Sequence, residues 1–185
     1  MQALRTTLLL PAVFVFLLTV VHVETVDAAP VGKVTRVQKQ AQVGSRPAKV
    51  GTSVNMNERL RTGPGARLQI TFVDGTNLTL GENASVVVDS YVYNPAKSVG
   101  QMALSSATGA LRFTTGKIGS MSKKDVTVST PQAALAVRGT DFWMGPIDGH
   151  YGAYVVDGKV DVGARGRTVR LKPGYGTDIR QRRRR

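Results

Sequence analysis

The sequence predicts an all-β fold, a single compact domain of short strands in a solenoid-like or sandwich-like arrangement. Three observations lead to this prediction. Apolar and polar residues alternate over short runs, Asp-Gly pairs follow several of these runs, and no segment after the N-terminal apolar run shows the apolar stripe of an amphipathic helix. The runs recur about every 8 to 12 residues, a spacing typical of β-sandwiches and related all-β folds.

The first 28 residues are typical of a secretory signal peptide. Arg5 supplies positive charge, Leu8–Val21 is apolar, and the small residues Val26 and Ala28 predict cleavage after Ala28. A retained membrane anchor is the alternative, but the apolar core is shorter than the roughly 20 residues that a spanning helix needs. We therefore expect a periplasmic or secreted mature chain without a transmembrane span.

The mature domain is expected to cover residues 31–179. Its clearest hairpin is ARLQITFVDGTNLTL, in which Leu68, Ile70 and Phe72 alternate with polar residues before the turn at Asp74 and Gly75. AYVVDGKVDV, residues 153–162, predicts a second hairpin around Asp157 and Gly158, and Asp148-Gly149 predicts a further turn. Other strands are expected at Lys33–Val37, Ser85–Tyr93, Met102–Thr108, Leu111–Thr115, Asp125–Ser129, Ala133–Val137, Thr168–Leu171 and Tyr175–Ile179.

The charge predicts an anionic partner. After cleavage the chain would carry 24 basic and 10 acidic residues, and a basic tail covers residues 180–185. A field of this sign favours an acidic envelope polymer or lipid. We do not expect nucleic acid, because the aromatic residues are not interleaved with the basic ones. The residues expected to contact an anionic surface are Arg180, Arg182, Arg183, Arg184 and Arg185.

The residue inventory predicts a non-enzymatic protein without a cofactor or metal. The chain has no cysteine, and the single histidine of the mature chain, His150, lies in a predicted turn. Asp89 and Asp141 are the carboxylates least easily explained by turns, so a hydrolase that uses carboxylates alone is the enzymatic alternative.

Arg138 ends the apolar run of TPQAALAVRGTDF and precedes Gly139, which permits a turn. We expect this arginine to be largely buried and paired with Asp141 or Asp89, since a buried unpaired charge is costly. An anion-binding role is the alternative.

This stretch resembles the hallmark segment of the FecR domain. Asn57–Tyr93, GALRFTTGKI and YVVDGKVDV are also similar to FecR motifs, in the same order. The resemblance implies an extracytoplasmic β-rich domain that acts by binding, with no catalytic residues. The residues that carry it, expected to be structural, are Thr130, Pro131, Arg138, Gly139, Thr140, Asp74 and Gly75.

In the namesake iron-transport regulators, the FecR domain relays a receptor signal to a sigma factor. The segment before the apolar run and the segment after Ile179 are short here. We therefore expect the extracytoplasmic module alone to carry over, as an interaction module in envelope signalling or assembly with an unknown envelope partner. A scaffold that binds envelope polysaccharide or peptidoglycan is the alternative.

Overall fold

The structure is a computed structural model that describes residues 29–179. The predicted signal peptide and the arginine tail lie outside the described residues. Within this range the chain forms strands joined by turns and two short 3-10 helices, so the all-β prediction is confirmed. None of the helices in residues 29–179 has the length and apolar character required to cross a membrane.

The elements follow one another along the chain with short connections. They are β1 (Gly32–Gln38), β2 (Ala41–Val43), β3 (Arg46–Pro47), β4 (Ser53–Val54), β5 (Arg59–Thr62), β6 (Arg67–Phe72), β7 (Asn77–Leu80), β8 (Ser85–Asn94), η1 (Pro95–Lys97), β9 (Val99–Thr108), β10 (Leu111–Thr114), η2 (Lys117–Ser120), β11 (Lys123–Ser129), β12 (Ala134–Ile147), β13 (His150–Ala164), β14 (Arg167–Leu171) and β15 (Gly176–Ile179).

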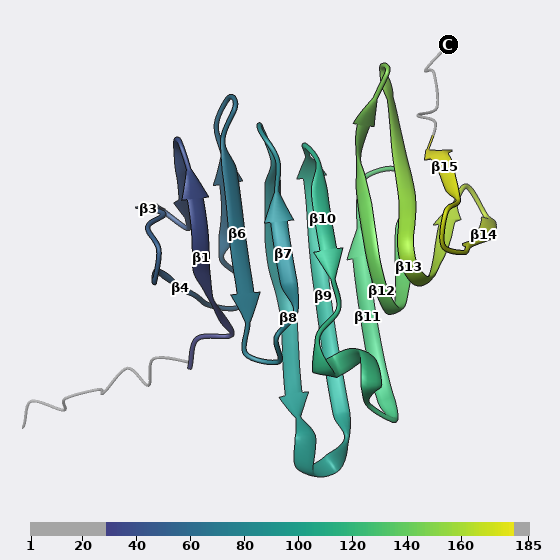
Figure 1. Cartoon of the computed structure of the whole chain (residues 1–185), viewed down its shortest axis with the longest axis horizontal. Coiled ribbons are helices and arrows are strands. Elements are labelled where there is room, and N and C mark those ends of the chain that lie inside the picture. Colours follow the sequence, from purple (N-terminus) through teal and green to yellow (C-terminus); the bar gives the residue numbers. More distant parts are fainter. Residues whose placement is uncertain (1–28, 180–185) are drawn as a thin grey trace, which may run out of the picture.

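All strands belong to one curled sheet with the order β3-β2-β5-β8-β9-β11-β12-β10-β7-β6-β1-β4. β13 pairs with β12, and β14 and β15 pair with β13. The pairs are antiparallel except for β9 with β11. In Figure 1 the curled sheet forms two layers, with β1, β6, β7 and β10 in front and β8, β9 and β11 behind.

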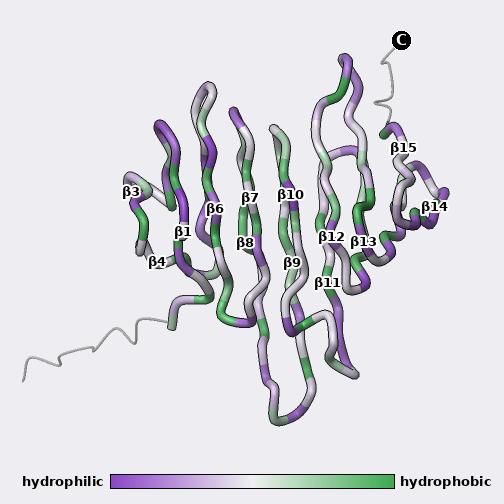
Figure 2. The backbone as a smooth tube through the Cα atoms, viewed as in Figure 1, coloured by the Kyte–Doolittle hydropathy of each residue, from purple (hydrophilic) through white to green (hydrophobic). Residues whose placement is uncertain are grey.

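One hydrophobic core lies between these layers, because the inward-facing positions of both contribute to the same cluster of buried residues. β6 buries Leu68, Ile70 and Phe72 and leaves its alternate residues at the surface. Figure 2 shows this alternation of hydrophobic and hydrophilic segments along the strands. The two-residue period of the sequence therefore sets which face of each strand is buried.

The chain passes between the layers at corners that stack on one another. The amide of Gly81 donates a hydrogen bond to the carbonyl of Ala110 at 2.8 Å. Gly109 has a φ of +80°, and a Cβ there would overlap the backbone of Ala84. The close approach of neighbouring corners thus requires small residues.

The hairpin at Asp74–Gly75 is confirmed as the β6–β7 connection, and the turn at Asp148–Gly149 connects β12 to β13. The other predicted strands are present, with bounds that differ by a few residues. The segment predicted as Ala133–Val137 forms a much longer strand than expected, because it continues as β12 to Ile147.

The predicted hairpin at Asp157–Gly158 is wrong, because both residues lie inside the continuous strand β13. Gly158 has a φ of +80°, and a side chain there would overlap the carbonyl of Gly139 on β12. The pair therefore marks a β-bulge. A bulge and a tight turn both need a residue at positive φ, which explains why the sequence pattern could not separate them.

The bulge changes which residues of β12 face the core. Arg138 pairs with Lys159, and the next aligned pair is Asp141 with Asp157, so two residues of β12 oppose one of β13. The register then shifts back, because Phe142 pairs with Val155 and Val156 of β13 has no aligned residue on β12. Before the bulge the odd-numbered residues of β12 are buried, and after it the even-numbered ones, beginning with Thr140, are buried. The extra residue allows one long strand to contact the core on both sides of the irregularity.

Gly158→Ala is expected to destabilise the fold far more than Gly149→Ala. Both glycines have positive φ, which costs an alanine about 1 kcal/mol, but only Gly158 lacks space for a methyl group. Overpacking adds about 1–3 kcal/mol at Gly158. Urea denaturation measures both free energies of unfolding. Equal losses for the two variants would contradict the steric role of the bulge.

Candidate functional site

The first predicted motif residue, Asp74, is a buried carboxylate that joins three segments of the chain. Its side chain accepts hydrogen bonds from the amide and hydroxyl of Thr76, at 3.2 and 2.7 Å, within the β6–β7 turn. It also accepts hydrogen bonds from the hydroxyl of Tyr91 on β8 at 3.1 Å and the amide of Ile118 on η2 at 3.2 Å. These four donors, all from the protein itself, satisfy the hydrogen-bonding capacity of the carboxylate oxygens.

The surroundings of Asp74 are closely packed. Burial, and after it the negative charge of Asp74, raises the pKa of Tyr91 well above its usual range. The Tyr91 ring stacks on Phe72 with 5.6 Å between centroids. A Cβ on Gly116 would overlap the backbone of the Asp74–Thr76 turn. Asp74 and Gly75 therefore form a structural joint, in which Asp74 is 1 % exposed.

Thr130 and Pro131 form the turn between β11 and β12. The Thr130 hydroxyl accepts hydrogen bonds from the amides of Gln132 and Ala133, at 3.2 and 3.0 Å. The amide of Thr130 donates to the carbonyl of Ala133 at 2.8 Å. Local bonds of this kind are typical of threonine at turns.

Gly139 and Thr140 form the bulge in β12. The buried Thr140 hydroxyl donates to the carbonyl of Lys159 at 2.8 Å, which connects the two sides of the bulge. On its other edge, the amide of Thr140 donates to the hydroxyl of Thr115 at 3.0 Å. Gly139, at a φ of +60°, provides the backbone conformation that the irregularity requires.

The expectation that Arg138 is buried is wrong, because 65 % of its side chain is exposed. Its nearest carboxylate is Asp161 on β13, at 3.6 Å, rather than Asp141 or Asp89. The main partner of Asp161 is Arg170 on β14, whose Nε lies 2.6 Å away. Hydrogen bonds from Arg170 lower the pKa of Asp161, against the effect of desolvation. Arg138 is thus a peripheral member of a surface charge cluster.

Asp89 and Asp141 do not form a pair. Asp89 is exposed on β8, and two strands separate β8 from β12 in the sheet order. Asp141 accepts two hydrogen bonds from Arg112 on β10, at 2.9 and 2.7 Å. These hydrogen bonds lower the pKa of Asp141, while desolvation opposes them. His150 is exposed beside the β12–β13 turn.

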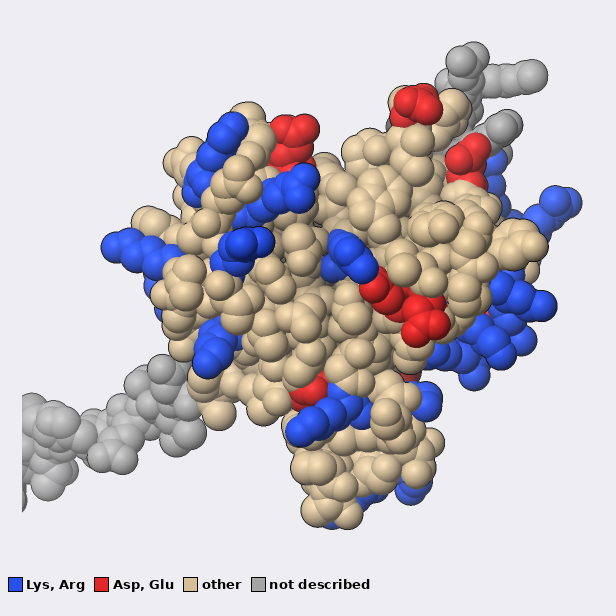
Figure 3. Space-filling model, viewed as in Figure 1, with Lys and Arg blue, Asp and Glu red and all other residues tan. Residues whose placement is uncertain are grey.

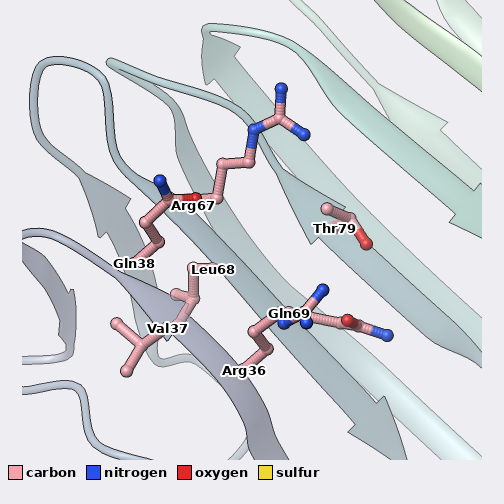
Figure 4. Close-up of a pocket in the computed structure, with 7 residues that line it drawn as sticks. All are labelled: Arg36, Val37, Gln38, Arg67, Leu68, Gln69 and Thr79. Carbon is pink, nitrogen blue, oxygen red and sulfur yellow. The ribbon is translucent and has the colours of Figure 1, made fainter.

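A depression on the outer face of the front layer is the feature that sequence reasoning missed. Neighbouring strands β1, β6 and β7 supply its polar side chains, and Figure 4 shows Arg67, Gln69 and Thr79 projecting into it. Register aligns Arg36 with Gln69, and Gln69 with Thr79. The lining residues are Arg36, Val37, Gln38, Arg67, Leu68, Gln69 and Thr79.

The two arginines of this depression make no ion pair with any residue in the range 29–179. In Figure 3, Lys and Arg side chains are spread over the β1 and β6 side of this face, with a carboxylate among them at the upper edge, and further carboxylates lie toward β12 and at the lower edge. The alternation of apolar and polar residues along each strand indicates that the polar residues of the depression face solvent. Only the pairing of β1 with β6 and of β6 with β7 brings them together. The predicted anionic-surface contacts of the tail lie outside the described residues.

The family model described as FecR protein matches residues 58–161, more than half of the chain. The chain belongs to the FecR family. The matched range includes the Asp74 joint, the Thr130 turn and the Gly139 bulge, so the FecR segment coincides with the structural motifs described above. No curated protein matches the sequence significantly.

Among solved structures, two crystal structures of a "putative anti-sigma factor" from Parabacteroides distasonis ATCC 8503 are similar to this FecR protein. Both are 23 % identical, with TM-scores of 0.48 and 0.49. The similarity covers 64 % of this chain and 52 % of the other, so the FecR protein spans about half the length of these relatives.

In this FecR domain, Asp74→Asn is expected to cost about 2–4 kcal/mol, because an amide cannot accept bonds from all four donors and leaves buried groups unsatisfied. Asp148→Asn is the matched control, since Asp148 also precedes a turn glycine but is exposed. Urea denaturation compares the two variants. A loss of less than about 1 kcal/mol for Asp74→Asn would contradict the role of the joint.

Arg112→Gln is expected to raise the pKa of Asp141 toward its ordinary value. In the wild type the lowered pKa contributes stability above the unfolded-state pKa, and this contribution is lost as the pH falls through the folded-state pKa. Carboxyl NMR titration measures the shift, and the stability difference between variant and wild type should shrink in acid. Arg59→Gln, which removes an arginine on β5, should leave the titration of Asp141 unchanged.

Proposed function

We propose that this FecR protein is a non-enzymatic interaction module that works outside the cytoplasm, in envelope signalling or assembly. The family match supports the type of module. The proposed location also rests on the signal-peptide pattern of residues 1–28, with cleavage after Ala28.

The binding role is supported by a difference between two sets of residues. The polar side chains of the motif residues bond within the protein, whereas charged side chains on the surface are exposed. Asp74, Thr130 and Thr140 direct their side-chain oxygens to internal hydrogen bonds. The side chains of Arg36 and Arg67 are exposed and make no ion pair in the described range. The motifs therefore maintain the fold, and the exposed basic face is available to a partner.

The positions of Asp89 and Asp141, the two carboxylates of the hydrolase alternative, support a non-enzymatic role. Asp141 is held by Arg112, and Asp89 lies on a strand that is not adjacent to β12. A glycosidase needs two carboxyl groups on either side of one bond, at most about 9.5 Å apart. In residues 29–179, no three His, Asp or Glu side chains gather as metal ligands would.

Expression of the full chain with a C-terminal reporter that is active only outside the cytoplasm tests the proposal. The reporter should be active, and mass spectrometry should find a mature chain that begins at Ala29. Photo-crosslinking from Thr79, on the outer face, should capture an envelope component, while the same probe at Asp89 on the back layer is the control.

Three results would count against this function. They are an inactive reporter on a chain that is expressed, equal capture from the two crosslinking positions, and turnover of an envelope polymer that is abolished by Asp89→Asn or Asp141→Asn. The last result would establish the hydrolase alternative.

A further inference from the structure

The outer face of the front layer carries a continuous row of side chains across neighbouring strands. Strand register aligns Arg36, Gln69, Thr79, Arg112, Trp143 and Tyr154, in that order, on β1, β6, β7, β10, β12 and β13. Buried residues flank the four central members on their own strands, so the row faces solvent. With strands about 4.8 Å apart, the row extends over about 24 Å, long enough for several units of a linear polymer.

One end of the row is cationic. Arg36 belongs to it, and Arg67 lies beside it on β6, paired with Gln38. Gln38, Gln69 and Thr79 line the same depression as these arginines (Figure 4). A guanidinium binds a carboxylate through two parallel hydrogen bonds, and amides and hydroxyls are suited to the hydroxyl groups of a sugar.

The other end of the row is aromatic, and its rings lie over glycines. The indole of Trp143 lies so close to the outer face of Gly145 that a Cβ there would be 2.9 Å from it. Tyr154 similarly lies 3.5 Å from the position of a Cβ on Gly176, and 43 % of Tyr154 is exposed. Aromatic side chains that lie along a sheet present a flat apolar surface, on which the C–H face of a sugar ring can pack.

The charges along the row favour a ligand with sparse negative charge. Arg112 is neutralised by Asp141, and Asp157, which is exposed, pairs with Asp141 in the register beside the aromatic end. A polyphosphate chain would bring a negative charge to each step and meet these carboxylates. Within the row and its immediate neighbours in the described residues, the arginines without an ion pair are Arg36 and Arg67 at the β1–β6 end, which suits a polymer that carries carboxylates on some of its units.

From this row we infer that the outer face of the front layer binds an acidic polysaccharide. Arg36 and Arg67 hold a carboxylate, Gln69 and Thr79 bind neighbouring hydroxyls, and Trp143 and Tyr154 pack against sugar rings farther along the chain. The inference rests on the proposed function, since it supplies a ligand for the interaction module.

Binding of purified mature protein to polygalacturonate, measured by affinity electrophoresis and calorimetry, tests this assignment. The double variant Arg36→Gln/Arg67→Gln should bind at least about tenfold more weakly, because charge-assisted hydrogen bonds are lost. The matched control Lys97→Gln/Lys123→Gln removes the same net charge away from the row and should change affinity less than about twofold. Tyr154→Ser should also weaken binding, with thermal denaturation as the check on folding.

Several results would overturn the inference. Equal weakening by the two double variants would indicate diffuse attraction, and unchanged binding by Tyr154→Ser would remove the aromatic contact. Tighter binding to single-stranded DNA or to phosphatidylglycerol vesicles than to polygalacturonate would assign the face to another ligand. Because these assays use purified protein, they do not depend on export, and failure of the reporter experiment would instead reject the proposed function.

Discussion

The two layers of the sheet depend on the carboxylate of Asp74. This group lies at the β6–β7 turn of the front layer and receives hydrogen bonds from Tyr91 in the back layer and from η2. An ionised group removed from water needs a complete set of donors, and four protein donors provide it here. The turn, the stacked Phe72–Tyr91 pair and the close approach of Gly116 are therefore parts of one arrangement.

The bulge between β12 and β13 is the second constraint, and it determines the outer face. Without the extra residue, Phe142 and Met144 would face solvent and Trp143 would face the core, because side chains alternate along a strand. The same irregularity therefore places the large apolar residues of β12 inside and Trp143 outside, and the second register shift, at Val156 of β13, aligns Trp143 with Tyr154. A motif with no exposed reactive group thus controls the position of the residues proposed to bind.

Local patterns predicted the all-β class, the β6–β7 hairpin and the Asp148–Gly149 turn, since alternation and turn residues act over a few positions. They failed where neighbours distant in sequence decide the outcome. Asp157-Gly158 forms a bulge because β12 approaches it, and Arg138 is exposed because its side chain extends over β13 rather than into the core. Arg36 and Gln69 are 33 positions apart, so their juxtaposition follows from strand pairing alone.

The borders of the sheet have a consequence for assembly. At one border β3 is only two residues long and includes Pro47, which has no N–H to donate to another strand. At the other end of the sheet order β4 is also only two residues long, and β14, which pairs with β13, carries Arg167 and Arg170 and exposes four of its five residues. Short, proline-containing or charged margins oppose the addition of further strands from another molecule. The domain can therefore present a broad sheet face at high local concentration without growing into cross-β aggregates.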